Sequence, residues 1–360
     1  MSRGPPTRTA TPAISITWSG LEPPGERNPS VQPLTILASG DHFVTTSLLT
    51  DALRDRVGAA HVTEQTLPWP LVPFGPVAEV DEASGSEDEL IAALPGVRVL
   101  VTQMAPVTER VLAAAPDLEL VVVCRGGPVN VNLEAAARHG VTVRATPGRN
   151  AIAAAEHAVA LLLAALRQIP QIHQGVREGQ WRSDLYALDA VGSELAGSTV
   201  GLIGFGAIGA RVARILRAFD ATVLVHDPFI ATAPEGVALV GLDELLERST
   251  SVSLHARLTP ENRHMIAAPQ LARMPRGAVL VNTARGGLLD YEAVADALDS
   301  GHLGAAAFDV YDAEPIPADS RLLKAPRTVL TPHLAGATRQ TAERAATLAA
   351  AEVASHYGLS

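Results

Sequence analysis

Three ionisable side chains in the C-terminal half of the chain have the types needed to bind an anion and move a proton. Arg285, Glu314 and His333 each follow a run of small and β-branched residues. A guanidinium offers two parallel donors to a carboxylate, and histidine is the usual side chain for reversible proton transfer near neutral pH. A nearby carboxylate favours the protonated imidazole. Taken singly, each residue has an ordinary explanation as a surface or turn residue, but their joint pattern favours one site.

Short apolar strands that alternate with helices are expected to position these side chains. The expected strands are 34–38, 97–102, 118–123, 141–144, 199–203, 222–226, 251–255, 278–282, 305–310 and 328–331. Apolar strands between helices indicate parallel sheets covered on both faces, which is the α/β class. Ligands of such sheets bind beyond the carboxyl ends of the strands, where Arg285, Glu314 and His333 would meet.

The length of 360 residues suggests two domains. We predict two doubly wound parallel-sheet domains, Rossmann-like or flavodoxin-like, with a cleft between them. A boundary is expected near 146–150, where Pro and Gly end a strand and Asn150 can cap an Ala-rich helix. Residues 150–333 would form one domain, and 34–149 with 334–360 the other. We interpret residues 1–33, which include seven prolines, as a flexible extension.

A glycine-rich turn is the most informative local motif. Gly204, Gly206 and Gly209 form G-x-G-x-x-G between an apolar strand and a helix that starts near Ala207. Such glycines permit a tight turn, the approach of a pyrophosphate and close packing of helix on strand. The amides of Ala207 and Ile208 would face the phosphates at the helix N-terminus. The motif alone is weak, but its context of strand, helix and a later acid predicts dinucleotide binding.

Asp227 ends the next strand, 18 residues after the last glycine of the turn. A carboxylate there can accept hydrogen bonds from the ribose hydroxyls of the adenosine. It would repel a 2′-phosphate, and residues 228–247 contain no Arg or Lys to neutralise one. The pattern predicts NAD (NADH) rather than NADP. The alternative is that Asp227 only caps the turn at Pro228.

The composition excludes several classes of function. The net charge is −10, which argues against a nucleic-acid or anionic-membrane surface. Lys324 is the only lysine and is not part of a phosphate-loop motif. Cys124 is the only cysteine, so neither an intramolecular disulfide nor a cysteine-based zinc site is possible. No histidine cluster has metal-ligand spacing, and a cytoplasmic setting without export fits best.

Several motifs, in order along the chain, together resemble the D-isomer-specific 2-hydroxyacid dehydrogenases, such as phosphoglycerate dehydrogenase and glyoxylate or hydroxypyruvate reductase. They cover nearly all of residues 34–350. The motifs are RGGPVNVNLEAA at 125–136, TPGRN at 146–150 with AEH at 155–157, TPENRH at 259–264, NTARG at 282–286, FDV at 308–310, EP at 314–315 and TPH at 331–333.

The resemblance implies a role for each motif residue. It makes Arg285 the substrate-binding residue and His333 the acid/base paired with Glu314, and it places the substrate carboxylate on the amides of Gly126 and Gly127. It puts Asp309 against the nicotinamide carboxamide. The other residues expected at the cofactor are His255, Thr283 and Ala284. It further implies a small 2-hydroxy or 2-oxo acid as substrate and a homodimer paired through the nucleotide domain.

Two other functions remain open on the same scaffold. One is oxidation of a different small anion, such as phosphite; formate is disfavoured, since formate enzymes of this fold carry Gln where Glu314 stands. The other is an NAD-sensing binding protein like the corepressors that share the fold and keep the Arg, Glu and His set. The sequence does not identify the substrate or the physiological direction.

Overall fold

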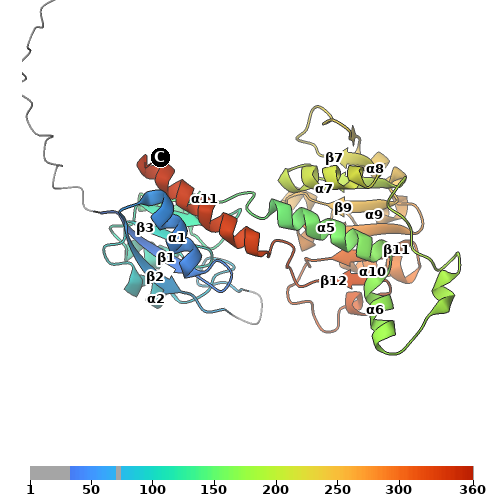
Figure 1. Ribbon diagram of the computed structural model, residues 1–360, viewed down its shortest axis with the longest axis horizontal. Coiled ribbons are helices and arrows are strands. Elements are labelled where there is room, and N and C mark those ends of the chain that lie inside the picture. The colour runs from blue at the N-terminus through green and yellow to red at the C-terminus, as the bar shows by residue number, and fades with distance from the viewer. Residues whose placement is uncertain (1–32, 70–73, 360) are drawn as a thin grey trace, which may run out of the picture. The chain divides into compact units, whose positions relative to one another are not determined.

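Two parallel β-sheets, each covered by helices, form the part of the chain that the computed structural model describes, residues 33–69 and 74–359 (Figure 1). This confirms the predicted α/β class. The predicted flexible extension falls, apart from Pro33, outside the described residues. The predicted domain limits stay a prediction.

The first sheet has five strands in the order β2-β1-β3-β4-β5. The strands are β1 (Thr35–Gly40), β2 (His61–Thr66), β3 (Val99–Thr102), β4 (Leu120–Val123) and β5 (Thr142–Ala145). The helices beside it are α1 (Thr46–Val57), α2 (Glu87–Ala93), α3 (Glu109–Ala113), α4 (Leu133–Arg138) and the C-terminal α11 (Arg339–Tyr357). The chain returns to this sheet at its end, because the alanine-rich face of α11 packs with α1 over β1, β3 and β4.

The second sheet has seven strands in the order β12-β11-β10-β9-β6-β7-β8. The strands are β6 (Thr199–Ile203), β7 (Thr222–His226), β8 (Ala238–Leu239), β9 (Ser251–Leu254), β10 (Ala278–Asn282), β11 (Leu303–Phe308) and β12 (Thr328–Leu330). One hydrophobic core joins one face to α5 (Ala151–Leu166) and α7 (Ala207–Ala218). A second core joins the other face to α8 (Leu242–Arg248), α9 (Ala268–Arg273) and α10 (Tyr291–Asp299).

The strand order reverses beside β6. From β6 the chain passes to β7 on one side and then returns to β9 on the other. The loops that follow β6 and β9 therefore diverge at the carboxyl edge, which is where ligands of doubly wound sheets bind. The glycine turn follows β6, and His255 follows β9.

Two edge strands were not predicted from the sequence. Strand β2 is His-Val-Thr-Glu-Gln-Thr and is mostly exposed, and β8 has only two residues. Both are strands because they pair with β1 and β7, respectively. A polar edge strand lacks the apolar run by which the buried strands were recognised.

The Ala-rich helix α5 begins where the boundary motif predicts, but the predicted cap is wrong in detail. Asn150 is the N-cap residue, yet its side chain makes no capping hydrogen bond. Its backbone, at φ −103° and ψ 6°, is not in the extended conformation that directs a cap side chain to the helix amides. A 64° bend separates α5 from α6 (Ile169–Arg177). Within the described residues, no single helix is long and apolar enough to cross a membrane, and only this bent pair passes such a test jointly.

Candidate active site

His333 and Glu314 form a direct pair. The ring nitrogen Nδ1 of His333 lies 2.7 Å from Oε2 of Glu314. The other carboxylate oxygen of Glu314 accepts the backbone N–H of Tyr311 at 3.0 Å, which fixes the carboxylate. The backbone of His333 has a φ of +55°, a left-handed conformation that is uncommon for a residue other than glycine. The predicted partners are therefore in contact, with the imidazole held at a strained turn.

The charges around this pair favour a protonated histidine beside an ionised carboxylate. The hydrogen bond to Glu314 raises the pKa of His333 above its ordinary value, against the opposing effect of burial. Burial by itself would raise the pKa of Glu314, but the hydrogen bonds from His333 and from the backbone of Tyr311 and the charges of His333 and Arg285 lower it overall. The charge of Arg285 also acts on His333, so all three predicted side chains lie within electrostatic reach of one another.

Asp309 is bonded to the loop that carries His333. Its carboxylate is fully buried and accepts three hydrogen bonds from the loop that carries His333. The donors are the hydroxyl of Thr331 at 2.6 Å and the backbone N–H groups of Leu334 at 2.8 Å and Ala335 at 2.7 Å. Asp309 thus holds the histidine loop in place. The predicted contact with the nicotinamide carboxamide stays a prediction.

His157, the histidine of the AEH motif, also contacts the loop that carries His333. Its Nε2 lies 3.1 Å from the hydroxyl of Thr331 and 3.6 Å from Oδ1 of Asp309. His157 is 174 residues before Thr331 and 152 residues before Asp309 in the chain. The packing of α5 on the sheet brings them together. The AEH motif was the signal in the sequence that could have identified His157.

Arg285 is exposed at the end of a rigid turn after β10. The buried Asn282 holds this turn by donating to the carbonyl of Arg285 at 2.9 Å and accepting from the N–H of Ala284 at 3.0 Å. A side chain at Gly286 would come within 1.9 Å of the backbone of Tyr311, so the turn can pack there only with glycine. In the structure the guanidinium donates to the carbonyl of Ala284 at 2.7 Å, which leaves its other donors for a ligand.

The glycine turn has the geometry that phosphate binding needs. Gly204 has a φ of +95° and lies against the backbone of residues 255 and 256, and Gly209 packs on the carbonyl of Gly204. By contrast, nothing lies within 4 Å of the position that a Cβ of Gly206 would take. Gly206 is the N-cap of α7, and no side chain caps this helix. Its first amides, including those of Ala207 and Ile208, lack intrahelical partners and fit a pyrophosphate.

Asp227 caps the turn at Pro228, which was the alternative role considered from the sequence, and its contact with the ribose stays a prediction. Its Oδ2 accepts the N–H of Phe205 in the glycine turn at 2.7 Å, and its Oδ1 accepts the N–H of Phe229 at 2.9 Å. It therefore caps the turn at Pro228 and also ties the end of β7 to the predicted phosphate site. Each carboxylate oxygen keeps a second lone pair with which it can accept a hydroxyl.

The remaining predicted cofactor residues lie at the same edge of the second sheet. Burial lowers the pKa of His255 to about 4, so its imidazole is neutral, and Nε2 lies 3.0 Å from the hydroxyl of Ser253. Thr283 is buried at the end of β10, and its hydroxyl has no hydrogen-bond partner in the described structure. An unpartnered buried hydroxyl fits a site that a polar ligand completes. Together with the glycine turn, these residues fit a dinucleotide.

Gly126 and Gly127, the predicted carboxylate-binding residues, follow β4 in the first sheet. Open space surrounds the position that a Cβ would take on either glycine. Neither backbone N–H has a backbone hydrogen-bond partner within the described part of the chain. Their amides are thus available to an anion, as the resemblance implies.

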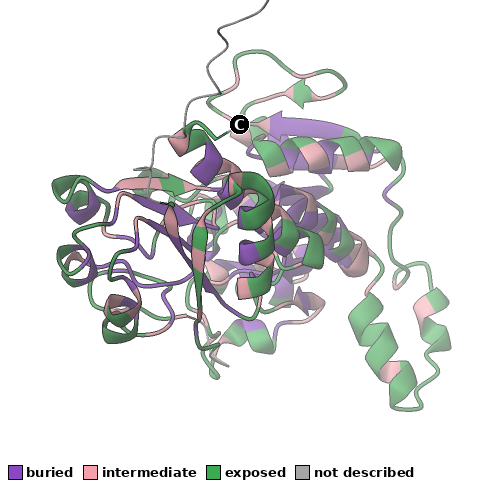
Figure 2. Ribbon diagram, turned by 60° about the vertical axis from the view of Figure 1, so that its left-hand side comes forward, coloured by how far each residue is buried: buried purple, intermediate pink, exposed green. Residues whose placement is uncertain are grey.

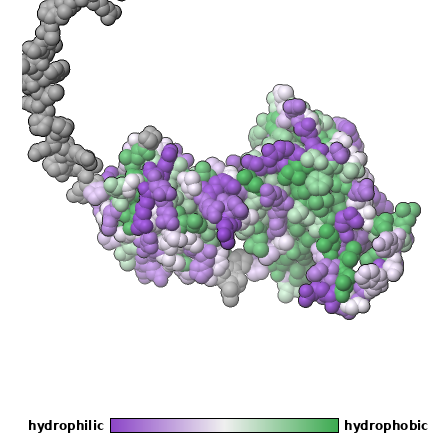
Figure 3. Space-filling model, viewed as in Figure 1, coloured by the Kyte–Doolittle hydropathy of each residue, from purple (hydrophilic) through white to green (hydrophobic). Residues whose placement is uncertain are grey.

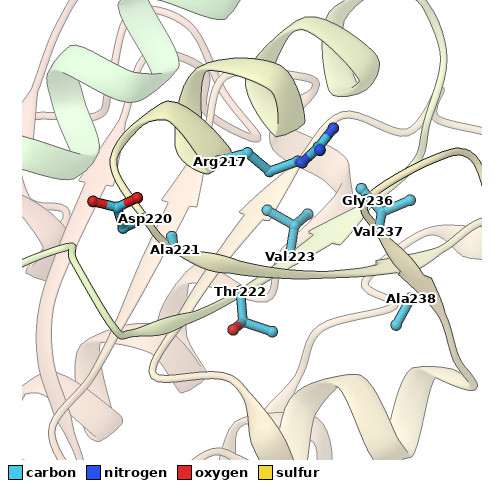
Figure 4. A pocket seen from close by; sticks show the side chains of 8 residues that line it. All are labelled: Arg217, Asp220, Ala221, Thr222, Val223, Gly236, Val237 and Ala238. Carbon is cyan, nitrogen blue, oxygen red and sulfur yellow. The ribbon is translucent and has the colours of Figure 1, made fainter.

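Two other features lie outside this site. An open surface pocket lies between Arg217 and Gly236, at the amino end of β7 and thus opposite the glycine turn (Figure 4). Cys124 is fully buried and is a core residue, and burial raises the pKa of its thiol to about 12. Over the residues that the structure describes, no group of three His, Cys, Asp or Glu side chains has the arrangement of a metal site.

Comparison with known proteins identifies the family. Residues 159–335 match the model of the D-isomer specific 2-hydroxyacid dehydrogenase, NAD binding domain. The chain is 40% identical over 291 residues to a D-3-phosphoglycerate dehydrogenase of Mycobacterium bovis, covering 79% of this chain and 54% of that protein. It is 39% identical over 274 residues to a glyoxylate reductase of Korarchaeum cryptofilum, covering 75% of this chain and 82% of that protein.

Solved structures agree with this match. The crystal structure of a Thermus thermophilus protein, 32% identical, superposes with a TM-score of 0.74 over 90% of this chain and 97% of the other. The chain spans about half the length of the phosphoglycerate dehydrogenases that it matches, 54% in the example above. Because its sequence matches the glyoxylate reductase over most of both chains and its fold is shared with the solved structure, the chain belongs to the D-isomer specific 2-hydroxyacid dehydrogenase family.

Proposed function

We propose that this protein is an NAD-dependent oxidoreductase that interconverts a small D-2-hydroxy acid and its 2-oxo acid. The observation that carries the proposal is the 2.7 Å pair of His333 and Glu314 within electrostatic reach of Arg285. The three side chains stand at the same carboxyl edge of the second sheet as the glycine turn. The named relatives, a phosphoglycerate dehydrogenase and a glyoxylate reductase, act on acids of this class.

Each residue of this group does one part of the proposed chemistry. The bound nicotinamide supplies or accepts the hydride. Arg285 binds the substrate carboxylate and polarises the neighbouring carbonyl. Because Nδ1 of His333 is engaged by Glu314, Nε2 is the atom that gives a proton to the carbonyl oxygen during reduction and removes it during oxidation. Glu314 keeps the imidazole charged and oriented, and the amides of Gly126 and Gly127 bind the same carboxylate.

The cofactor is NAD rather than NADP. Asp227 lies beside the glycine turn, and its negative charge would face a 2′-phosphate on the adenosine ribose. No lysine or arginine follows it up to residue 247 to offset that repulsion.

A homodimer paired through α6 and the segment after it is part of the proposal. Ile169, Ile172 and Val176 form an apolar stripe on α6 and are 53%, 39% and 53% exposed. Figure 2 shows that α6 is exposed along most of its length. Trp181 and Leu188 are 85% and 92% exposed, and Figure 3 shows hydrophobic side chains on the surface of this part of the molecule. An exposed apolar group of this size indicates a protein contact, and a second copy is the partner that the family favours. The cytoplasm is the proposed location.

A panel of anions tests this function against its two alternatives. NADH oxidation would be followed with glyoxylate, pyruvate, hydroxypyruvate and larger 2-oxo acids, and NAD reduction with phosphite. Turnover of at least one 2-oxo acid and none of phosphite is the expected result. Turnover of phosphite alone would favour the alternative in which the protein oxidises a small anion other than a 2-hydroxy acid. Tight NADH binding without turnover of any acid would identify a sensor of NADH.

A further inference from the structure

Several buried polar atoms lie at one edge of the described part of the first sheet and have no hydrogen-bond partner. They are Oδ2 of Asp41, Oε1 of Gln103, Oδ1 of Asn130, and both Nε and Nη1 of Arg149. These residues follow β1, β3, β4 and β5, respectively, so all four lie at the carboxyl ends of the strands. Gly126 and Gly127, which would hold the substrate carboxylate, belong to the same edge. Unsatisfied groups in such a place are typical of a binding site that a ligand completes.

Arg149 is the only cation in this group, and no ion pair or hydrogen bond engages its buried Nε and Nη1 in the described structure. Its guanidinium stands 5.9 Å from the centre of the Phe43 ring. Burial lowers the pKa of Arg149, and the charge of the neighbouring Arg125 lowers it further. The charge of Asp41 acts in the opposite direction and raises the pKa of Arg149. Asp41 does not hydrogen-bond the guanidinium, however, because its Oδ1 accepts the backbone N–H groups of Phe43 and Val44. Two donors of a buried guanidinium are thus left without an acceptor.

The neighbouring Arg125, unlike Arg149, has an ion-pair partner. It forms an ion pair with Glu82 and also donates to the carbonyl of that residue. Its charge is therefore already balanced within the described structure. Arg149, although its Nε and Nη1 are buried, is partly exposed as a residue, so a ligand can approach its side chain from solvent. A buried charge that is left unpaired is strongly destabilising, which is a cost that an anionic ligand would remove.

We propose that Arg149 binds a second anionic group of the substrate, at the end remote from the 2-oxo carboxylate. This inference rests on the proposed function and narrows its substrate class to 2-oxo acids that carry a distal carboxylate or phosphate. The only lysine of the chain, Lys324, lies beside the second sheet and not at this edge of the first. The oxygens of Asp41, Gln103 and Asn130 would accept hydrogen bonds from ordered water or from hydroxyl groups between the two anions.

The test compares matched substrates in the wild type and in Arg149→Met. 2-Oxoglutarate and 3-phosphohydroxypyruvate carry a distal carboxylate and a distal phosphate, and 2-oxohexanoate carries neither. Removing a charged hydrogen bond should lower the ratio of kcat/KM for a doubly charged acid to that for 2-oxohexanoate by about 10- to 100-fold. The control is Arg144→Met, which removes an exposed guanidinium from the same sheet and should leave the ratio unchanged. The acid that loses more identifies the preferred distal group.

Stability measurements separate binding by Arg149 from a structural role. Without ligand, Arg149→Met should melt at a higher temperature than the wild type, since an unpaired buried charge is replaced by an apolar side chain. 2-Oxoglutarate or 3-phosphohydroxypyruvate should raise the melting temperature of the wild type more than that of the variant. A lower melting temperature of the variant, with an unchanged substrate ratio, would overturn the inference.

Failure of the two proposals gives different results. If no 2-oxo acid is turned over, the proposed function fails, and the melting temperatures with the two doubly charged acids then decide the role of Arg149. If 2-oxo acids are turned over but Arg149→Met and Arg144→Met affect the ratio equally, the proposed function stands and the second anion site is wrong.

Discussion

At the scale of single residues, the geometry of His333 depends on two carboxylates with different tasks. Glu314 contacts the imidazole itself, whereas the fully buried Asp309 bonds the loop on which the imidazole stands. A left-handed backbone conformation for His333 persists only where the surroundings enforce it. The three hydrogen bonds to Asp309, from the hydroxyl of Thr331 and from the backbone N–H groups of Leu334 and Ala335, provide that constraint.

The first prediction at this scale concerns the pH dependence of Glu314→Gln. Since Glu314 raises the pKa of His333, the protonated donor in the wild type persists above the ordinary histidine pKa of 6.5. Reduction should therefore be fast at low pH and decline as the pH rises through that raised pKa. In the variant the decline should move to lower pH, while oxidation of the hydroxy acid should begin at lower pH. An unchanged profile of kcat/KM against pH would refute the pairing.

The second prediction concerns the choice of cofactor. Like charges brought together at a binding site cost several kcal/mol, so kcat/KM should favour NADH over NADPH by more than about 10²-fold. The double variant Asp227→Ala, Phe229→Arg should narrow this ratio by weakening NADH and admitting NADPH. Phe229 is 95% exposed, so the new arginine causes no clash there. Equal efficiency of the wild type with both cofactors would show that Asp227 does not face the ribose.

The sequence predicted the direct partners in the site better than the groups behind them. Glu314 and His333 are 19 residues apart; their places after strands put them at one edge, and the family resemblance paired them. The contact of His157 with Thr331 spans 174 residues and depends on how α5 packs over β12. Side-chain direction at that distance is set by tertiary packing and is not encoded in any local pattern. The burial of Asp309 escaped prediction for the same reason.

At the scale of elements, the three glycines of the turn have different physical reasons to be glycine. A Cβ on Gly209 would come within 2.3 Å of the carbonyl of Gly204, whereas a Cβ on Gly206 would meet open space. We predict that Gly206→Ala folds with nearly unchanged stability but binds NADH at least about tenfold more weakly, a loss of ~1.4 kcal/mol. Isothermal titration with NADH and thermal melting would measure the two effects.

Gly209→Ala is the matched comparison for this prediction. It should lower stability by about 1–3 kcal/mol, because helix α7 must move away from the turn. Equal loss of stability in the two variants, or full NADH affinity in Gly206→Ala, would contradict the phosphate-binding role of the turn.

The elements were recognised from the sequence where burial made them distinctive. The ten predicted strands correspond to ten of the twelve observed, and their ends differ by a few residues, as at β11, which begins at Leu303 rather than 305. The strands β2 and β8 were missed because their stability comes from pairing with a neighbour at the edge of a sheet. Similarly, the position of Asn150 before α5 was correct, but its backbone conformation could not be read from its type.

At the scale of the whole molecule, the exposed apolar side chains of α6 and of the residues after it support the proposed homodimer. Trp181→Glu combined with Leu188→Glu should yield a monomer with an intact fold, because both side chains are exposed in the single chain. Light scattering after size-exclusion chromatography should give twice the chain mass for the wild type and the chain mass for the variant. A monomeric wild type would contradict the proposed dimer.

The central claim is that the second sheet presents a bound nicotinamide and a protonated His333 to one carbonyl group. His333→Ala, measured for both turnover and NADH affinity, tests it most directly. The account predicts a loss of about 10²–10⁴-fold in kcat for the best 2-oxo acid, since a general acid is removed. NADH should bind with nearly wild-type affinity, because His333 has no hydrogen bond or ion pair with the glycine turn in the described structure. Turnover above a tenth of the wild-type rate would contradict the claim.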